Sequence, residues 1–280
     1  MINVMVSFAR IAREIPSQIY TSRRTLAQKA AVAQELDIKL VEWRETLPGY
    51  LHKDRNSLRQ PDFVNKQSIA PTSSKLIPEI VLELRFYHLR LLIHQPFLAA
   101  TEESETYRDH VDRCVSASTS TIHHLHETFL HRHYFRSWWY NCTYALFASM
   151  VLLFYIFKNP LSDKVPSVCL DIEMSMEVFT AMGHHRVAKR CLELVSEVYE
   201  LAKKTIREQQ EGPSSPATFD DGFDFFSNLI DPFLLEDYAF NDAKVDGITP
   251  GAWNVAPADP NFGIDSGNAL ELFLNFTANR

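Results

Sequence analysis

Glycine is scarce over most of the chain. Of the eight glycines in 280 residues, only Gly49 and Gly183 precede residue 211. Neither stands in a glycine-rich loop of the kind whose backbone N–H groups hold a phosphate, and no G-x-S-x-G nucleophile motif occurs. Tight hairpin turns also depend on glycine, so a turn-rich β fold is excluded for this part. The scarcity disfavours nucleotide-binding and hydrolase classes.

Cysteine is scarce as well. The four cysteines, Cys114, Cys142, Cys169 and Cys191, are 28, 27 and 22 residues apart. No pair has the C-x-x-C spacing with which two thiolates share a zinc ion, and the composition is not that of a disulfide scaffold. Each cysteine lies in an apolar stretch with helical spacing, so we expect buried free thiols in a reducing compartment. The first residues also lack the layout of a secretion signal.

Histidine does cluster, in the run HHLHETFLHRH. This run holds five histidines: His123, His124, His126, His131 and His133. The zinc-protease pattern places two histidines four residues apart on one helical face, with a glutamate between them. His131 follows His126 by five residues, about 140° further round a helix, so this pattern is not met. We expect a histidine-rich exposed or interhelical surface, no metal ligand, no catalytic residue, and a protein that is not an enzyme.

Positive and negative charges nearly balance in the first part of the chain, whereas negative charge dominates the last part. Residues 1–210 hold 26 Lys and Arg against 23 Asp and Glu, whereas residues 211–280 hold 2 against 12. This balance excludes a strongly basic nucleic-acid-binding surface. The last part is also rich in glycine and proline, a composition that disfavours a packed core. The sequence therefore predicts a helical domain over 1–208 and a mostly disordered acidic tail over 209–280.

Apolar residues recur at helical spacing throughout the first part. The expected helices cover 2–20, 24–46, 78–95, 104–132, 138–157 and 167–208, the last broken near Gly183, with a connecting loop over about 52–77. No alternating strand of useful length occurs, so we predict an all-α, irregular bundle of about six to eight helices. The closing helix is expected to direct one face inward: Val187, Cys191, Leu194, Val198 and Leu201.

Long apolar runs are rare, and only residues 137–157 pass the length test for a membrane span. These 21 residues carry no charge, but they include Asn141, Cys142, Thr143 and Ser149. They also lie among amphipathic helices of similar length. We predict a buried central helix and no membrane contact, and a membrane helix stays as the alternative.

The acidic tail interleaves carboxylates with large apolar side chains over residues 219–240. Close-set carboxylates repel one another and keep aromatic rings accessible, which is typical of a transcriptional activation segment that docks on a coactivator. The candidate contacts are Phe223, Phe225, Phe226, Phe233, Leu234 and Tyr238. The alternative is a tail that packs back on the helical domain through Phe233, Leu234 and Tyr238.

Several segments resemble the regulatory, or middle homology, domain of fungal zinc-cluster transcription factors. ELDIKLVEWRETLPGYL (35–51) is similar to that family's L-x3-L-x2-W-x3-LP helix end, and LRFYHLRLLIHQPFL (84–98) to its signature helix with a His/Arg-Pro-Phe-Leu turn. RCVSASTSTIHHL (113–125), WWYNCTYALFASMVLLFY (138–155) and AMGHHRVAKRCLELVSEVYEL (181–201) follow in the family's order. The residues that carry the first two motifs are Leu36, Leu40, Trp43, Leu47, Pro48, His94, Pro96, Phe97 and Leu98.

This resemblance implies an all-helical domain that controls RNA polymerase II transcription in the nucleus, in some members by sensing a small molecule. The family's six-cysteine zinc cluster, basic linker and coiled coil do not occur in this sequence, so we expect no zinc, no other cofactor and no direct DNA contact from this chain. The expected partners are a coactivator or the transcription machinery, a small-molecule effector, and a homo- or heterodimer with a related factor. The alternative is a truncated ligand-binding or dimerisation module that acts through a partner factor, such as a pathway-specific regulator of a secondary-metabolite gene cluster.

Overall fold

Helices account for nearly all of the residues that the structure describes. The structure is a computed structural model, and it describes residues 2–48, 72–100, 105–131, 135–136, 138 and 140–211, all within a unit that spans Met1–Ala217. Over these residues there are seven α-helices and no strand: α1 (Ile2–Ile15), α2 (Leu26–Glu45), α4 (Thr72–His94), α5 (Glu105–His131), α6 (Asn141–Lys158), α7 (Val165–Ala181) and α8 (Arg186–Glu211). The predicted all-α bundle is confirmed. The tail beyond Glu211, with its candidate segment 219–240, lies outside the described residues.

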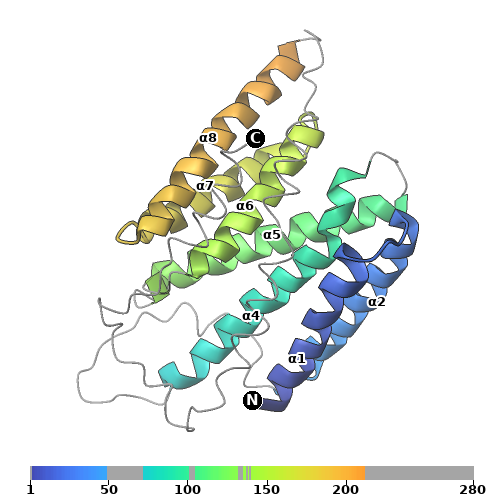
Figure 1. Cartoon of the computed structure of the whole chain (residues 1–280). Helices are drawn as coiled ribbons and strands as arrows, with labels where there is room; N and C mark the ends of the chain where they lie inside the picture. Colours follow the sequence, from blue (N-terminus) through green and yellow to red (C-terminus); the bar gives the residue numbers. More distant parts are fainter. Residues whose placement is uncertain are drawn as a thin grey trace, which may run out of the picture. The chain divides into compact units, whose positions relative to one another are not determined.

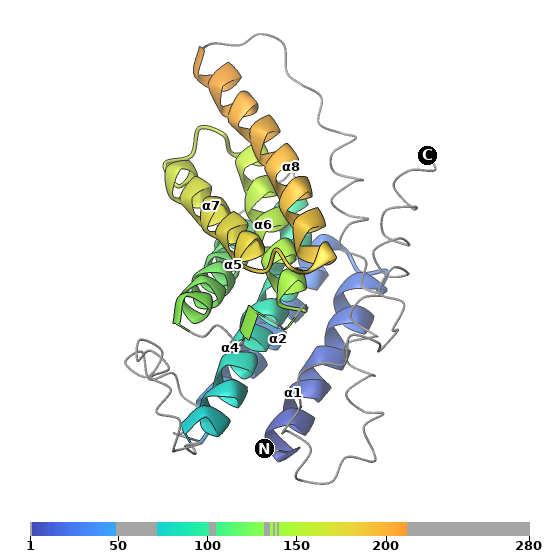
Figure 2. The same ribbon diagram turned by 90° about the vertical axis from the view of Figure 1, so that its left-hand side faces the viewer.

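Helix α5 is the shared element of the bundle. It packs against α4 on one side and against α6 and α7 on the other. Figures 1 and 2 show α1, α2 and α4 grouped on the α4 side of α5, and α6, α7 and α8 grouped on its opposite side. The buried positions of α5 include Cys114, Ser118, Ile122, Leu125 and Phe129.

The first helix continues past its proline as a π-helical turn, η1 (Pro16–Tyr20). Proline has no N–H to donate to the preceding turn, and the local widening accommodates this loss. The turn buries Ile19 and directs the Tyr20 hydroxyl to the backbone oxygen of Leu92 in α4, 2.8 Å away. The segment 2–20 therefore packs as one continuous amphipathic element, as its spacing predicts.

Helix α2 begins with a capping box and buries one face. The Thr25 side chain accepts a hydrogen bond from the Gln28 N–H, while the Gln28 side chain accepts one from the Thr25 N–H. Near its end, Trp43 lies 4.9 Å from the Phe8 ring and donates from Nε1 to the Val4 backbone oxygen, 3.0 Å away. These contacts fix α2 against α1.

Helix α4 begins earlier than the sequence pattern predicts. The predicted loop over 52–77 overlaps its first six residues, because α4 starts at Thr72 and carries Pro78 inside the helix. Proline has no backbone N–H, so α4 lacks one hydrogen bond at this position, and the helix nevertheless continues to His94. At the other end, α4 passes into the 3₁₀ turn η3 (Gln95–Ala99), where Pro96 occupies an initial position.

Helix α6 is the apolar centre of the second group. It is the one described helix that is long and apolar enough to cross a membrane, and 78% of that window is buried inside the bundle. It packs against α5, α7 and α8. Core helices of water-soluble bundles pass the same length test, so its burial agrees with the predicted central helix.

Helix α8 buries a different face from the one predicted. Its fully buried positions are Ala188, Cys191, Val195, Tyr199 and Ala202. Of the predicted inward set, Cys191 alone is fully buried, and Leu201 is 46% exposed. The two small alanines allow α8 to approach α6 and α7 closely, so the buried face is rotated by about 90° from the larger aliphatic side chains.

Candidate functional site

A group of charged and polar side chains is buried where α2, α4, α5 and η3 meet. We call Asp37, Arg90, His94, His110 and Arg113 the polar cluster. The Asp37 side chain is 2% exposed and that of His94 is fully buried, whereas the Arg90 and Arg113 side chains keep 27% and 38% exposure. The carboxylate thus lies inside, and the two guanidinium groups reach from it toward the surface.

Asp37 is the centre of the polar cluster. Arg90 donates to both carboxylate oxygens, with Nε–Oδ1 and Nη2–Oδ2 distances of 2.8 and 3.2 Å. Arg113 donates from Nη1 to Oδ2 at 2.6 Å, and His94 Nε2 lies 3.4 Å from Oδ1. One carboxylate from α2 therefore links α4 through Arg90 and α5 through Arg113, by charge-assisted hydrogen bonds of the strong class.

The two histidines of the cluster share one proton. Their Nδ1 atoms are 2.8 Å apart, so one nitrogen must donate and the other accept. If His110 carries its proton at Nδ1, His94 Nδ1 is the acceptor. Neutral His94 then carries its own proton at Nε2, the nitrogen that lies nearest Asp37. The opposite arrangement would direct a lone pair of His94 at the carboxylate. The negative charge of Asp37 therefore favours the arrangement in which His110 donates to His94 and neutral His94 carries its proton at Nε2.

Burial and charge determine the protonation states of these groups. Burial alone would raise the pKa of the Asp37 carboxyl, but its contacts with His94 and Arg90 outweigh burial and hold the pKa well below its ordinary value. Burial lowers the pKa of His94, although Asp37 opposes part of that effect. Burial, assisted by the charges of His94 and Arg113, lowers the pKa of His110 to about 4. The cluster therefore holds an ionised Asp37 and neutral histidines near neutral pH.

Local packing fixes these side chains in place. Asp37 follows Ala33 by four residues and precedes Leu40 by three, so it belongs to the buried face of α2. The His110 ring stacks on Phe97 of η3, with 4.2 Å between ring centroids and 23° between ring planes. The turn after α4 therefore covers one side of the histidine pair.

Most of the predicted signature residues are buried in the structure. Leu36, Leu40, Trp43, Leu47, His94 and Phe97 are all buried, while Pro48, Pro96 and Leu98 are partly exposed. His94 is itself a member of the polar cluster, and Phe97 contacts His110. Asp37, Arg90, His110 and Arg113 were not predicted as site residues. The available signal was the place of Asp37 on an otherwise apolar helical face.

The histidine run forms contacts between helices, as predicted. His123 Nε2 of α5 lies 2.6 Å from Oδ1 of Asp171 in α7, and Thr119 donates to Oδ2 of the same carboxylate at 2.8 Å. His126 Nε2 lies 2.7 Å from Oε2 of Glu177, also in α7. No group of three potential metal ligands occurs among the described residues. His123 and His126 therefore connect α5 to α7.

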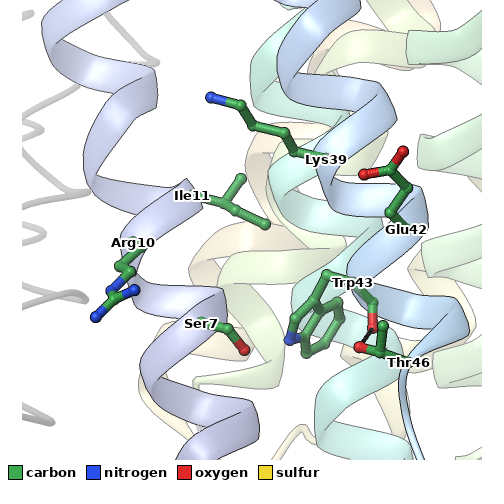
Figure 3. A pocket seen from close by; sticks show the side chains of 7 residues that line it. All are labelled: Ser7, Arg10, Ile11, Lys39, Glu42, Trp43 and Thr46. Atoms are coloured by element: carbon green, nitrogen blue, oxygen red, sulfur yellow. Dashed lines mark hydrogen bonds between the residues drawn. The ribbon is translucent and has the colours of Figure 1, made fainter.

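An open groove lies between α1 and α2, as Figure 3 shows. Its volume is about 350 Å³, and Trp43 and Ile11 line it together with the charged side chains of Arg10, Lys39 and Glu42. Lys39 already pairs with Glu14 at 2.8 Å, and Ile11 and Trp43 are 8% and 5% exposed. The groove offers little apolar surface to a ligand.

No protein-family model, curated protein or solved structure matches this chain. The polar cluster and the fold are therefore the observations from which a function can be argued.

Proposed function

We propose that this chain is a fungal transcription regulator that acts on RNA polymerase II transcription through its helical domain and through an acidic activation segment at residues 219–240. The proposed location is the nucleus, and the proposed partner of the tail is a coactivator or the transcription machinery. The chain itself is proposed to act without zinc, without enzymatic activity and without direct DNA contact.

One observation carries this proposal. Three of the segments that resemble the regulatory domain supply four of the five members of the polar cluster: 35–51 contributes Asp37, 84–98 contributes Arg90 and His94, and 113–125 contributes Arg113. Segments that recur together in a family are expected to meet in space when they serve one structural purpose. Their convergence on a single carboxylate supports the resemblance more strongly than any single motif does.

The proposed activation segment is tested by fusing residues 211–280 to an unrelated DNA-binding domain and measuring a reporter gene. We expect activation, and we expect Phe233→Ala with Leu234→Ala to lower it more than Asp231→Asn. Burial of each large apolar side chain on a coactivator contributes roughly 1.5–3 kcal/mol, whereas an exposed charge contributes about 0–1 kcal/mol. Phe262→Ala, outside the segment, is the control. An inactive fusion, or a larger effect of Asp231→Asn, would contradict the proposal.

A second function, that of a dimerisation module, is favoured by the apolar positions of α8 that the bundle leaves partly exposed. Val187, Leu194 and Val198 are only partly buried, and Leu201 is 46% exposed. Under this proposal the tail would be inert in the reporter assay, and the chain would co-purify with its partner.

A further inference from the structure

Helix α8 carries two neighbouring rows of apolar residues, and the bundle buries one of them more completely than the other. The used row is Ala188, Cys191, Val195, Tyr199 and Ala202, which is buried against α6 and α7. The second row lies about 90° further round the helix and consists of Val187, Leu194, Val198 and Leu201. These side chains range from partly buried to 46% exposed.

The spacing of the second row is that of a coiled-coil seam. Leu194, Val198, Leu201 and Thr205 are separated by four, three and four residues, which places them alternately at the d and a positions of a heptad. In an antiparallel pair of such helices, Val198 of one copy lies opposite Leu201 of the other, and Leu194 lies opposite Thr205. The two-fold symmetry of a homodimer repeats each of these pairs.

The charges beside this seam select the antiparallel arrangement. The g positions are Glu197 and Lys204, and in the antiparallel register Glu197 of one copy faces Lys204 of the other, twice per dimer. In a parallel arrangement the g positions would face the e positions, which are Val195 and Ala202 and carry no charge. Lys204 makes only an exposed contact with Glu208 at 3.7 Å, and Glu197 is exposed with no ion pair among the described residues.

We propose that this face of α8 binds a second copy of the chain in an antiparallel homodimer, with Val198 against Leu201 at its centre and Glu197 against Lys204 beside it. The inference rests on α8 alone, so it does not depend on the role of the tail in transcription. The seam from Leu194 to Thr205 spans only about 17 Å, so the dimer is weak and forms as the chain concentration rises.

The test is a charge exchange in the full-length chain, followed by sedimentation equilibrium over about a hundredfold range of concentration. Glu197→Lys and Lys204→Glu each place like charges opposite one another twice per dimer. Each single variant is expected to raise the dimer dissociation constant about tenfold, which corresponds to about 1.4 kcal/mol. The double variant restores the opposite charges in exchanged positions, so its dissociation constant should return close to that of the original chain.

Lys189→Glu is the matched control, because Lys189 is exposed on the same helix at an f position away from the seam. It should leave the dissociation constant unchanged, and circular dichroism should show that all four variants keep their helix content. A chain that is monomeric over the whole range would overturn the proposal. So would a dimer that is insensitive to both single variants, or one that the double variant fails to restore.

Discussion

Replacing Asp37 by Asn is the most informative perturbation of the polar cluster. Asparagine keeps the size of the side chain but removes the negative charge, and it directs an NH₂ group at one of the two arginines. Arg90 and Arg113 then share a single acceptor oxygen in place of two charged ones, and His94 loses the carboxylate that lies 3.4 Å from its Nε2. Two cations and a buried imidazole are left without a counter-charge.

The size of the effect follows from the burial of each partner. Removing one member of a buried ion pair costs about 3–5 kcal/mol. The Arg90 and Arg113 side chains keep 27% and 38% exposure, so water can solvate them after the change and reduce the cost. We expect a loss of about 2–3 kcal/mol in the free energy of unfolding, out of the roughly 5–15 kcal/mol of a typical protein.

The measurement is urea unfolding followed by circular dichroism at neutral pH. Asp37→Asn should lower the midpoint by about 1 M, with little change in the slope. Asp112→Asn is the matched control, because Asp112 also accepts an ion pair of 2.6 Å, from Lys164, but both side chains are about half exposed. That change should cost less than about 1 kcal/mol. Equal losses in the two variants, or a loss below about 0.5 kcal/mol for Asp37→Asn, would refute the reasoning.

Three further outcomes are expected. The pKa values of His94 and His110 are lowered by burial, that of His110 to about 4, so the unfolded chain takes up protons first as the pH falls. The free energy of unfolding should therefore decrease as the pH falls from about 6.5 toward 4, and urea titrations that show an increase would contradict this. Asp171→Ala should cost about 1–3 kcal/mol in the same assay, because Thr119 and a histidine lose their acceptor. Burial raises the pKa of Cys142 to about 12, so a thiol reagent should modify the half-buried Cys169 well before it; equal rates would be inconsistent with the structure.

The spacing of apolar residues was sufficient to predict where the helices lie. The row from Ala30 to Trp43 in α2 is buried as its period indicates. The face of α8 was predicted wrongly because two apolar rows compete on that helix, and side-chain size favours the row that the bundle leaves partly exposed. Periodicity cannot rank the two rows, since the choice depends on how closely alanines let α6 and α7 approach.

The candidate site was less accessible to sequence reasoning. Arg90 and Arg113 lie 53 and 76 residues from Asp37 along the chain, on two other helices, and only the packing brings their charges together. A lone aspartate on an apolar face indicates a buried partner without identifying it. The His94 and Phe97 positions were recognised through a family resemblance, but their contact with His110 depends on the turn of η3.

The position of α5 has a consequence for how the protein loses its structure. Both groups of helices pack on α5, so the unfolding of α5 would expose an apolar face of each group. Neither group can open fully while the other stays native, so unfolding should be a single cooperative event despite the apparent division seen in Figure 1. The amides at the centre of α5 should accordingly be among the slowest in the molecule to exchange with solvent deuterium.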